Sequence, residues 1–97
     1  MPESSAAPSD FNACGTEFLL RELELALTFM DFATVSIAPE RTQHAHARAA
    51  HAHQTVLRFL PSVRPGPEQN RIIQRNLARL ESRMTVAGLS THTTLST

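Results

Sequence analysis

Apolar residues three and four positions apart run through residues 16–37 and predict an α-helix, because such positions fall on one side of a helix. One stripe comprises Leu19, Leu23, Ala26, Met30, Ala33 and Ile37. An offset second stripe comprises Phe18, Leu25, Phe29 and Phe32 and is interrupted by Glu22. Together they span about twice the roughly 100° arc with which a helix faces a single neighbour. We therefore expect this helix to be covered from two directions, by two helices or by one helix and a second chain.

A second helix is predicted over residues 40–60. Pro39 disfavours helical conformation at the residue before it and suits the first turn of a new helix, with Glu40 beside it. The short connection makes the two helices antiparallel. The side expected to be buried consists of Thr42, Ala45, Ala49, Ala52, Val56, Phe59 and Leu60. Its three alanines predict a close approach to the first helix.

Three prolines within residues 61–67 mark a loop, and Pro67 followed by Glu68 predicts the start of a third helix, at 67–85. Gly88 is the expected stop after this helix. The side expected to be buried consists of Asn70, Ile73, Leu77, Leu80 and Met84.

These patterns predict an all-α protein of one domain, a small antiparallel three-helix bundle running up, down and up over residues 16–85. Residues 1–15 are rich in Pro, Ser and Ala and are expected to be disordered, and residues 86–97 are expected to form a flexible tail. The alternative is a two-helix hairpin that dimerises, with the third helix swapped or splayed.

Charge is divided along the chain although the net charge is zero. Residues 1–40 carry seven acids and one arginine, a net −6, while residues 41–97 carry eight arginines and two acids, a net +6. Ion pairs between an acidic first helix and basic later helices explain the division internally. The other interpretation is a surface with two electrical poles that suits a charged partner.

The composition also bears on the compartment. A single cysteine, Cys14, has no partner for an intrachain disulfide, so a reducing compartment is expected. No segment approaches the ~20 apolar residues of a membrane span, because Arg21, Glu22 and Glu24 interrupt the best candidate. We expect a cytoplasmic protein without a membrane partner.

Four histidines in the second predicted helix raise the question of metal binding. Chelation by one helix needs a spacing of three or four residues, but His44, His46, His51 and His53 are separated by two, five and two. No two of them can hold one ion, so we expect no metal and no cofactor. His44 and His51 are expected in solvent, and His46 and His53 at the border of the core with one ring nitrogen in water.

Catalysis has little support in the sequence. Only three glycines are present and none belongs to a phosphate-binding loop, and no pair of acids falls in an expected cleft. An enzyme is therefore not expected. A histidine phosphotransfer protein, with His44 beside Arg48, is kept as a remote alternative.

The leading hypothesis is a small non-catalytic helical interaction module: a regulator, adaptor or assembly subunit that binds a protein partner or a second copy of itself as a homodimer. The alternative is a nucleic-acid-associated protein that uses an Arg/His stripe on the second and third helices. Zero net charge and the lack of aromatic residues on those faces argue against nucleic acid. The candidate partner surface comprises Arg41, His44, Arg48, His51, Arg58, Arg71, Arg75 and Arg79.

Overall fold

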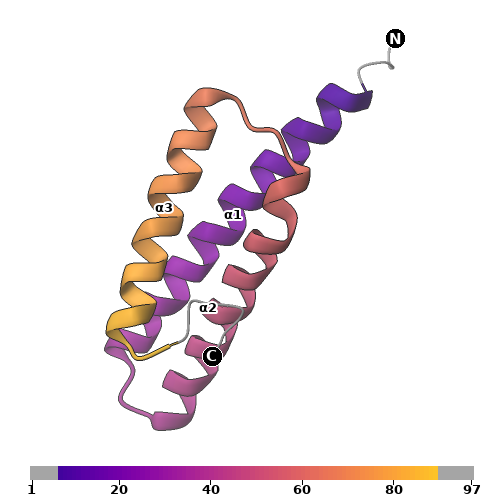
Figure 1. Cartoon of the computed structure of the whole chain (residues 1–97). Helices are drawn as coiled ribbons and strands as arrows, with labels where there is room; N and C mark the ends of the chain where they lie inside the picture. The colour runs from indigo at the N-terminus through magenta and orange to yellow at the C-terminus, as the bar shows by residue number, and fades with distance from the viewer. Residues whose placement is uncertain (1–6, 90–97) are drawn as a thin grey trace.

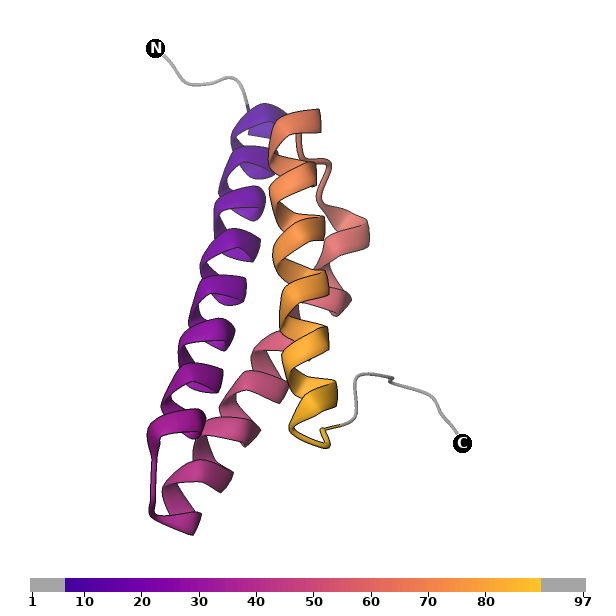
Figure 2. The ribbon, with the colours of Figure 1, turned by 90° about the vertical axis from the view of Figure 1, so that its left-hand side faces the viewer.

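A computed structural model of the chain describes residues 7–89. Three α-helices, α1 (Ala7–Val35), α2 (Pro39–Phe59) and α3 (Pro67–Val86), are joined by short connections, one of which holds a 3-10 turn, η1 (Leu60–Ser62). α1 lies between α3 and α2 in the view of Figure 1 and packs against both, while α2 and α3 approach each other least (Figures 1 and 2). The predicted all-α bundle of three helices is confirmed.

Both predicted proline start signals lie at the first position of a helix. Pro39 follows Ala38, whose backbone is extended (φ −88°, ψ 121°), and Pro67 follows Gly66, which is also extended (φ −65°, ψ 165°). A proline suits this position because its fixed φ is helical and its missing N–H would have no partner within the helix. The two prolines therefore fix where α2 and α3 begin.

Gly88 ends α3, as predicted. Its φ of +83° lies in the left-handed region that glycine adopts without steric cost. The Gly88 N–H donates to the Thr85 carbonyl at 3.0 Å, and the Leu89 N–H donates to the Met84 carbonyl at 2.8 Å. This is a Schellman motif, and it folds Leu89 back against the core.

The prediction of a disordered segment over 1–15 is wrong for residues 7–15, because α1 begins at Ala7 and not at Thr16. Gly15 does not precede the helix but lies within it, where a Cβ would stand 2.8 Å from Val63 Cγ2. Its missing side chain lets the loop before α3 pack onto α1. Residues 1–6 and 90–97, which include most of the predicted C-terminal tail, lie outside the described residues.

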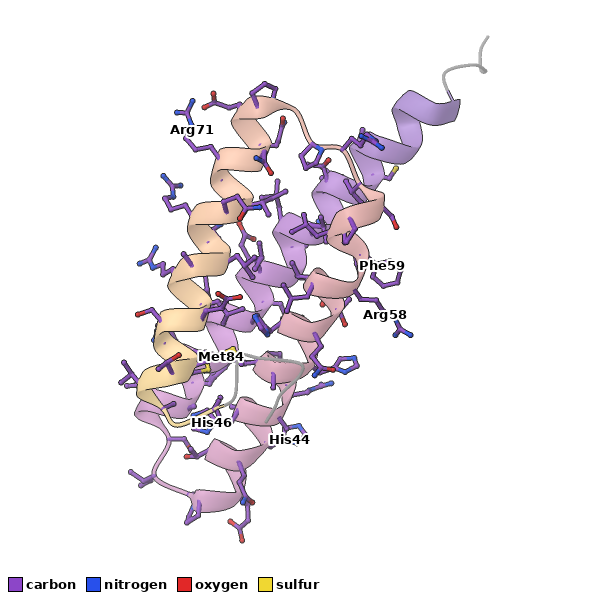
Figure 3. The ribbon with its side chains drawn as sticks, in the orientation of Figure 1. His44, His46, Arg58, Phe59, Arg71 and Met84 are labelled. Atoms are coloured by element: carbon purple, nitrogen blue, oxygen red, sulfur yellow. The ribbon has the colours of Figure 1, made fainter. Side chains whose placement is uncertain are left out.

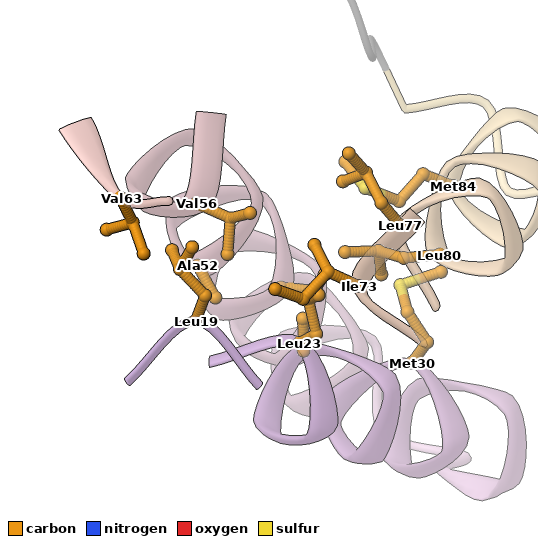
Figure 4. Packing of buried hydrophobic residues seen from close by; sticks show 12 residues of the cluster. Leu19, Leu23, Met30, Ala52, Val56, Val63, Ile73, Leu77, Leu80 and Met84 are labelled. Carbon is orange, nitrogen blue, oxygen red and sulfur yellow. The ribbon is translucent and has the colours of Figure 1, made fainter. Parts of the chain in front are cut away.

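The core is one cluster to which all three helices contribute (Figure 4). From α1 it takes the first four residues of the first predicted stripe, from α2 Ala49, Ala52 and Val56, and from α3 four of the five predicted residues. Ala33 and Ala45 are buried outside this cluster. Val63 closes one end of the cluster and Met84 lies toward the other (Figure 4). The buried hydrophobic residues are Leu19, Leu23, Ala26, Met30, Ala33, Ala45, Ala49, Ala52, Val56, Val63, Ile73, Leu77, Leu80 and Met84.

Several residues predicted in the buried stripes are not buried. Ile37 is 98% exposed because α1 ends at Val35, before this position. Asn70 is exposed, Thr42 is only half-buried, and Phe59 keeps 46% of its surface exposed. The buried side of each helix is thus narrower than predicted at the helix ends, where the neighbouring helices diverge or stop.

We predict that truncating a buried side chain of α3 destabilises the protein, whereas truncating an exposed side chain of the same helix does not. Leu80→Ala removes a fully buried side chain and should lower the free energy of unfolding by about 2–5 kcal/mol, because a cavity remains. Val86→Ala, at an 87% exposed position of the same helix, should change it by less than about 0.5 kcal/mol. Urea denaturation followed by circular dichroism measures both. Equal effects of the two variants would contradict the packing of α3.

Candidate interaction surface

The eight residues predicted as a partner surface do not form one surface. His44 and Arg58 of α2 and Arg71 of α3 point to opposite sides of the molecule (Figure 3). Arg71, Arg75 and Arg79 are spaced by four residues along an exposed side of α3, and Arg71 lies 3.8 Å from Glu68 of its own helix. The predicted basic surface therefore divides into an α2 group and an α3 group.

The α2 group lies beside α1. All five of its members are exposed, and they fall into two rows spaced by seven residues, one with Arg41 and Arg48 and the other with His44, His51 and Arg58. The Arg48 guanidinium carbon stands 5.4 Å from the centroid of the Phe29 ring of α1. This geometry is a cation–π contact, and it brings the row with Arg48 next to the second apolar stripe of α1.

That second stripe is largely exposed. Phe18, Leu25 and Phe32 retain 42%, 46% and 58% of their surface, so the two neighbouring helices cover only one side of α1. The Phe18 ring meets the Phe59 ring of α2 edge to face, with centroids 6.1 Å apart. We call the exposed or half-exposed set that these contacts bring together the apolar band. It comprises Phe18, Leu25, Phe29 and Phe32 of α1 and Phe59 of α2.

A groove of about 750 Å³ continues the apolar band at the end of the α1–α2 hairpin. Its apolar walls come from both helices and from their connection, and Glu40, Arg41 and His44 line its α2 side. Val35 and Ile37, which are 75% and 98% exposed, also contribute. The groove is open, and its mainly apolar lining suits apolar side chains.

Ion pairs within the described chain leave most of the segregated charge without a partner. Asp31 of α1 pairs with Arg83 of α3, and this is the one ion pair between α1 and a later helix among the described side chains. Within the same residues Glu17 and Glu24 on α1, and Arg41 and Arg58 on α2, have no ion pair. Among the described side chains, ion pairs between α1 and the later helices therefore account for only one of the acids of α1.

The exposed histidines are as expected, but the prediction that His53 keeps one ring nitrogen in water is wrong, because this side chain is buried. His44 and His51 are exposed, His46 is half-buried, and His53 is only 2% exposed. His53 Nε2 lies 2.9 Å from Glu81 Oε2, which ties α2 to α3. Over residues 13–89 the side chains contain no group of three or more metal-ligating residues that could hold an ion.

His44 is exposed and stands one helical turn before Arg48, the placement that the phosphotransfer alternative needs. Arg48, however, contacts the Phe29 ring, and the chain supplies His44 with no hydrogen-bond partner among the described residues. This alternative gains no further support from the geometry.

Comparison with protein-family models, with curated proteins and with solved structures finds no match for the chain. Among residues 7–89, none of the helices combines the length and the apolar character needed to cross a membrane.

Sequence reasoning missed the apolar band as a surface, because both stripes of α1 were expected to be covered. One signal was present: the facing side of α2 is made of Ala45, Ala49 and Ala52, whose short side chains cannot reach around α1 to the second stripe. The sequence pattern also predicts Phe59 in the core, although this residue is the aromatic side chain that α2 adds to the exposed face.

We predict that the His53–Glu81 contact stabilises the bundle because it gives the buried Nε2 atom of His53 a hydrogen-bond partner. Glu81→Ala should lower the free energy of unfolding by about 1–3 kcal/mol, because it leaves His53 Nε2 buried without its partner. Combining it with His53→Leu should cost less than the sum of the two single changes. Urea denaturation of the four proteins in this double-mutant cycle measures the coupling. Strict additivity would show that the contact contributes nothing.

Proposed function

We propose that the protein is a non-catalytic helical interaction module that binds a protein partner through the α1–α2 face. The observation that supports this proposal most strongly is the apolar band, in which Phe18, Leu25, Phe32 and Phe59 each keep more than two fifths of their surface exposed. Scattered apolar residues on a surface are ordinary, but a contiguous group with polar residues at its edges is typical of a protein interface.

The composition of the face agrees with this proposal. Aromatic side chains and arginine are enriched where proteins bind one another, because both offer large contact area together with directional contacts. The α1–α2 face has this combination in Phe29 and Arg48, already held together by the chain itself. The Arg48 side chain is therefore partly positioned before a partner arrives, which reduces the entropy lost on binding.

We predict that Phe32→Ser abolishes partner binding while the fold persists, because this side chain is 58% exposed. The measurement is affinity purification of the tagged full chain from its own cells at low salt, with untagged copies co-expressed and mass spectrometry of the proteins recovered. Val86→Ser is the matched control, since it removes an exposed apolar side chain away from the apolar band. Recovery of the same proteins with Phe32→Ser and wild type would contradict the proposal.

Nucleic-acid binding is retained as the second candidate because Arg48 and Phe29 lie together on one face. The sequence argument that aromatic residues are lacking beside the arginines therefore does not hold for α2. Arginine and an exposed ring are the elements that proteins use to bind single-stranded nucleic acid by charge and stacking.

This second candidate predicts that a fluorescent single-stranded oligonucleotide binds at 50 mM salt and that its affinity falls steeply by 200 mM, because phosphate contacts release counterions. Arg48→Gln should weaken that binding and reduce the slope. Arg75→Gln, a change of the same charge on the far side of α3, should leave it unchanged if the α2 group is responsible. An unchanged anisotropy at 50 mM salt would exclude this candidate.

A further inference from the structure

We propose that the partner of the α1–α2 face is a second copy of this chain, related by a two-fold axis that runs parallel to the helices. The proposal rests on the interaction module proposed above and specifies its partner. In this arrangement α2 of each copy lies over α1 of the other, and the four helices form an antiparallel bundle around the two apolar bands. The evidence is the order in which acidic, apolar and basic residues follow one another across the face.

Three parallel strips make up this order. On α1, Glu17, Glu24 and Asp31 recur every seven residues along the edge away from α2, where Asp31 pairs with Arg83 of α3. The exposed Arg21 lies between this row and the apolar band. The apolar band follows, and beyond it α2 carries its basic residues, whose outer row also repeats every seven positions. This outer row consists of His44, His51 and Arg58.

Symmetry decides how two such faces meet. A two-fold axis parallel to the strips places the acidic strip of one copy over the basic strip of the other, with apolar on apolar. A two-fold axis that lies in the plane of the contact but perpendicular to the strips places the acidic strip over the acidic strip and the basic strip over the basic strip. Only the first arrangement is self-complementary, and like charges facing each other across an interface oppose the second.

The register along the helices fits the first arrangement. The contacts of Phe18 with Phe59 and of Phe29 with Arg48 show which residues of α1 and α2 stand at equal height. An axis parallel to the helices leaves heights unchanged, so Glu17 of one copy comes level with Arg58 of the other to within about 3 Å, two residues of helical rise.

The next step of seven residues along each helix keeps the same register. It places Glu24 of one copy level with His51 of the other, again within about 3 Å. Both acids lack an ion pair within the described part of their own chain, as does Arg58. A second copy thus brings opposite charge to Glu17 and Arg58, which their own bundle leaves without it, and places the His51 imidazole level with Glu24.

The groove at the end of the hairpin fits the same occupant. Phe32 of one copy reaches the height of Ala45 of the other, and Ala45 lines the groove together with Arg41 and His44. An aromatic ring therefore faces an apolar wall whose edge carries the Arg41 guanidinium, which attracts the negative face of the ring, beside the Glu40 carboxylate. The two grooves of a dimer would each receive one such ring.

The test is sedimentation equilibrium of the full chain from about 1 to 500 μM, with circular dichroism to verify folding of each variant. We expect a mass of twice 10.7 kDa at the upper concentrations. Phe32→Ser should leave a folded monomer. Arg58→Glu should raise the dissociation constant on the order of tenfold, because two symmetry-related contacts become repulsive, and Glu17→Arg should do the same.

The double variant Arg58→Glu with Glu17→Arg should restore the wild-type dissociation constant, since the charges are exchanged across the interface. Arg75→Glu, on the exposed side of α3, is the matched control and should have no effect. A dimer that survives Phe32→Ser would overturn the location of the interface. Failure of the exchanged pair to restore binding would overturn the direction of the axis.

A wild-type mass of one chain up to 500 μM would overturn the second copy as the occupant. The interaction module is tested separately, by the proteins recovered in affinity purification. If the chain is monomeric and a different protein is recovered with wild type but not with Phe32→Ser, the proposal of an interaction module holds and the partner is another chain. An amphipathic helix with acidic residues has the matching chemistry. If the same proteins are recovered with Phe32→Ser and with wild type, the proposal of an interaction module is wrong.

Discussion

The close packing of α1 on the alanine side of α2 is the contact on which the rest of the structure depends. Ala45, Ala49 and Ala52 are almost completely buried, and their small side chains let the two backbones approach closely, which favours good packing of the leucines opposite. The same small side chains limit how much of α1 they cover. The close contact on one side of α1 therefore leaves the second apolar stripe exposed to solvent.

The third helix completes the core without correcting this asymmetry. Its buried side chains are large, Ile73, Leu77, Leu80 and Met84, and they fill the side of α1 that α2 leaves open. α3 touches α2 little, so the direct ties between these two helices matter. His53 and Glu81 provide one such tie at 2.9 Å. The bundle thus has α1 as its centre, and its free surface is the side of α1 opposite to α3.

The sequence predicts best what local stereochemistry determines. Pro39 and Pro67 begin helices because the φ angle of proline is already helical, and Gly88 ends one because glycine adopts a positive φ without strain. All three residues lie at the predicted helix ends. The start of α1 fails for an instructive reason. Gly15 looks like a residue that interrupts a helix, but it provides space for Val63, a residue far away along the chain. A pattern within one segment does not contain that information.

The candidate surface fails in prediction for a related reason. Whether the stripe with Phe18 and Phe32 is covered depends on how α1 is rotated relative to the two other helices. The periodicity of apolar residues gives the width of the apolar arc, but it does not say which elements pack against that arc. The same holds for His53, whose position at the border of the core follows from its place on α2. Its partner Glu81 stands 28 residues later and on a different helix.

The division of charge gives a final constraint on what the free surface can bind. A chain with net charge zero carries no overall repulsion against a copy of itself, so local patterns of charge decide whether two copies attract. Had ion pairs within the bundle neutralised α1 against the later helices, the surface would be electrically uniform and the apolar band alone would set no direction for a partner. Because Asp31 with Arg83 is the one such pair in the described region, Glu17 and Glu24 on one side of the apolar band and Arg58 on the other keep their charges without an ion pair. An apolar strip between strips of opposite sign is complementary to itself after a half-turn about its own length, and this property follows from the order of residues on two adjacent helices.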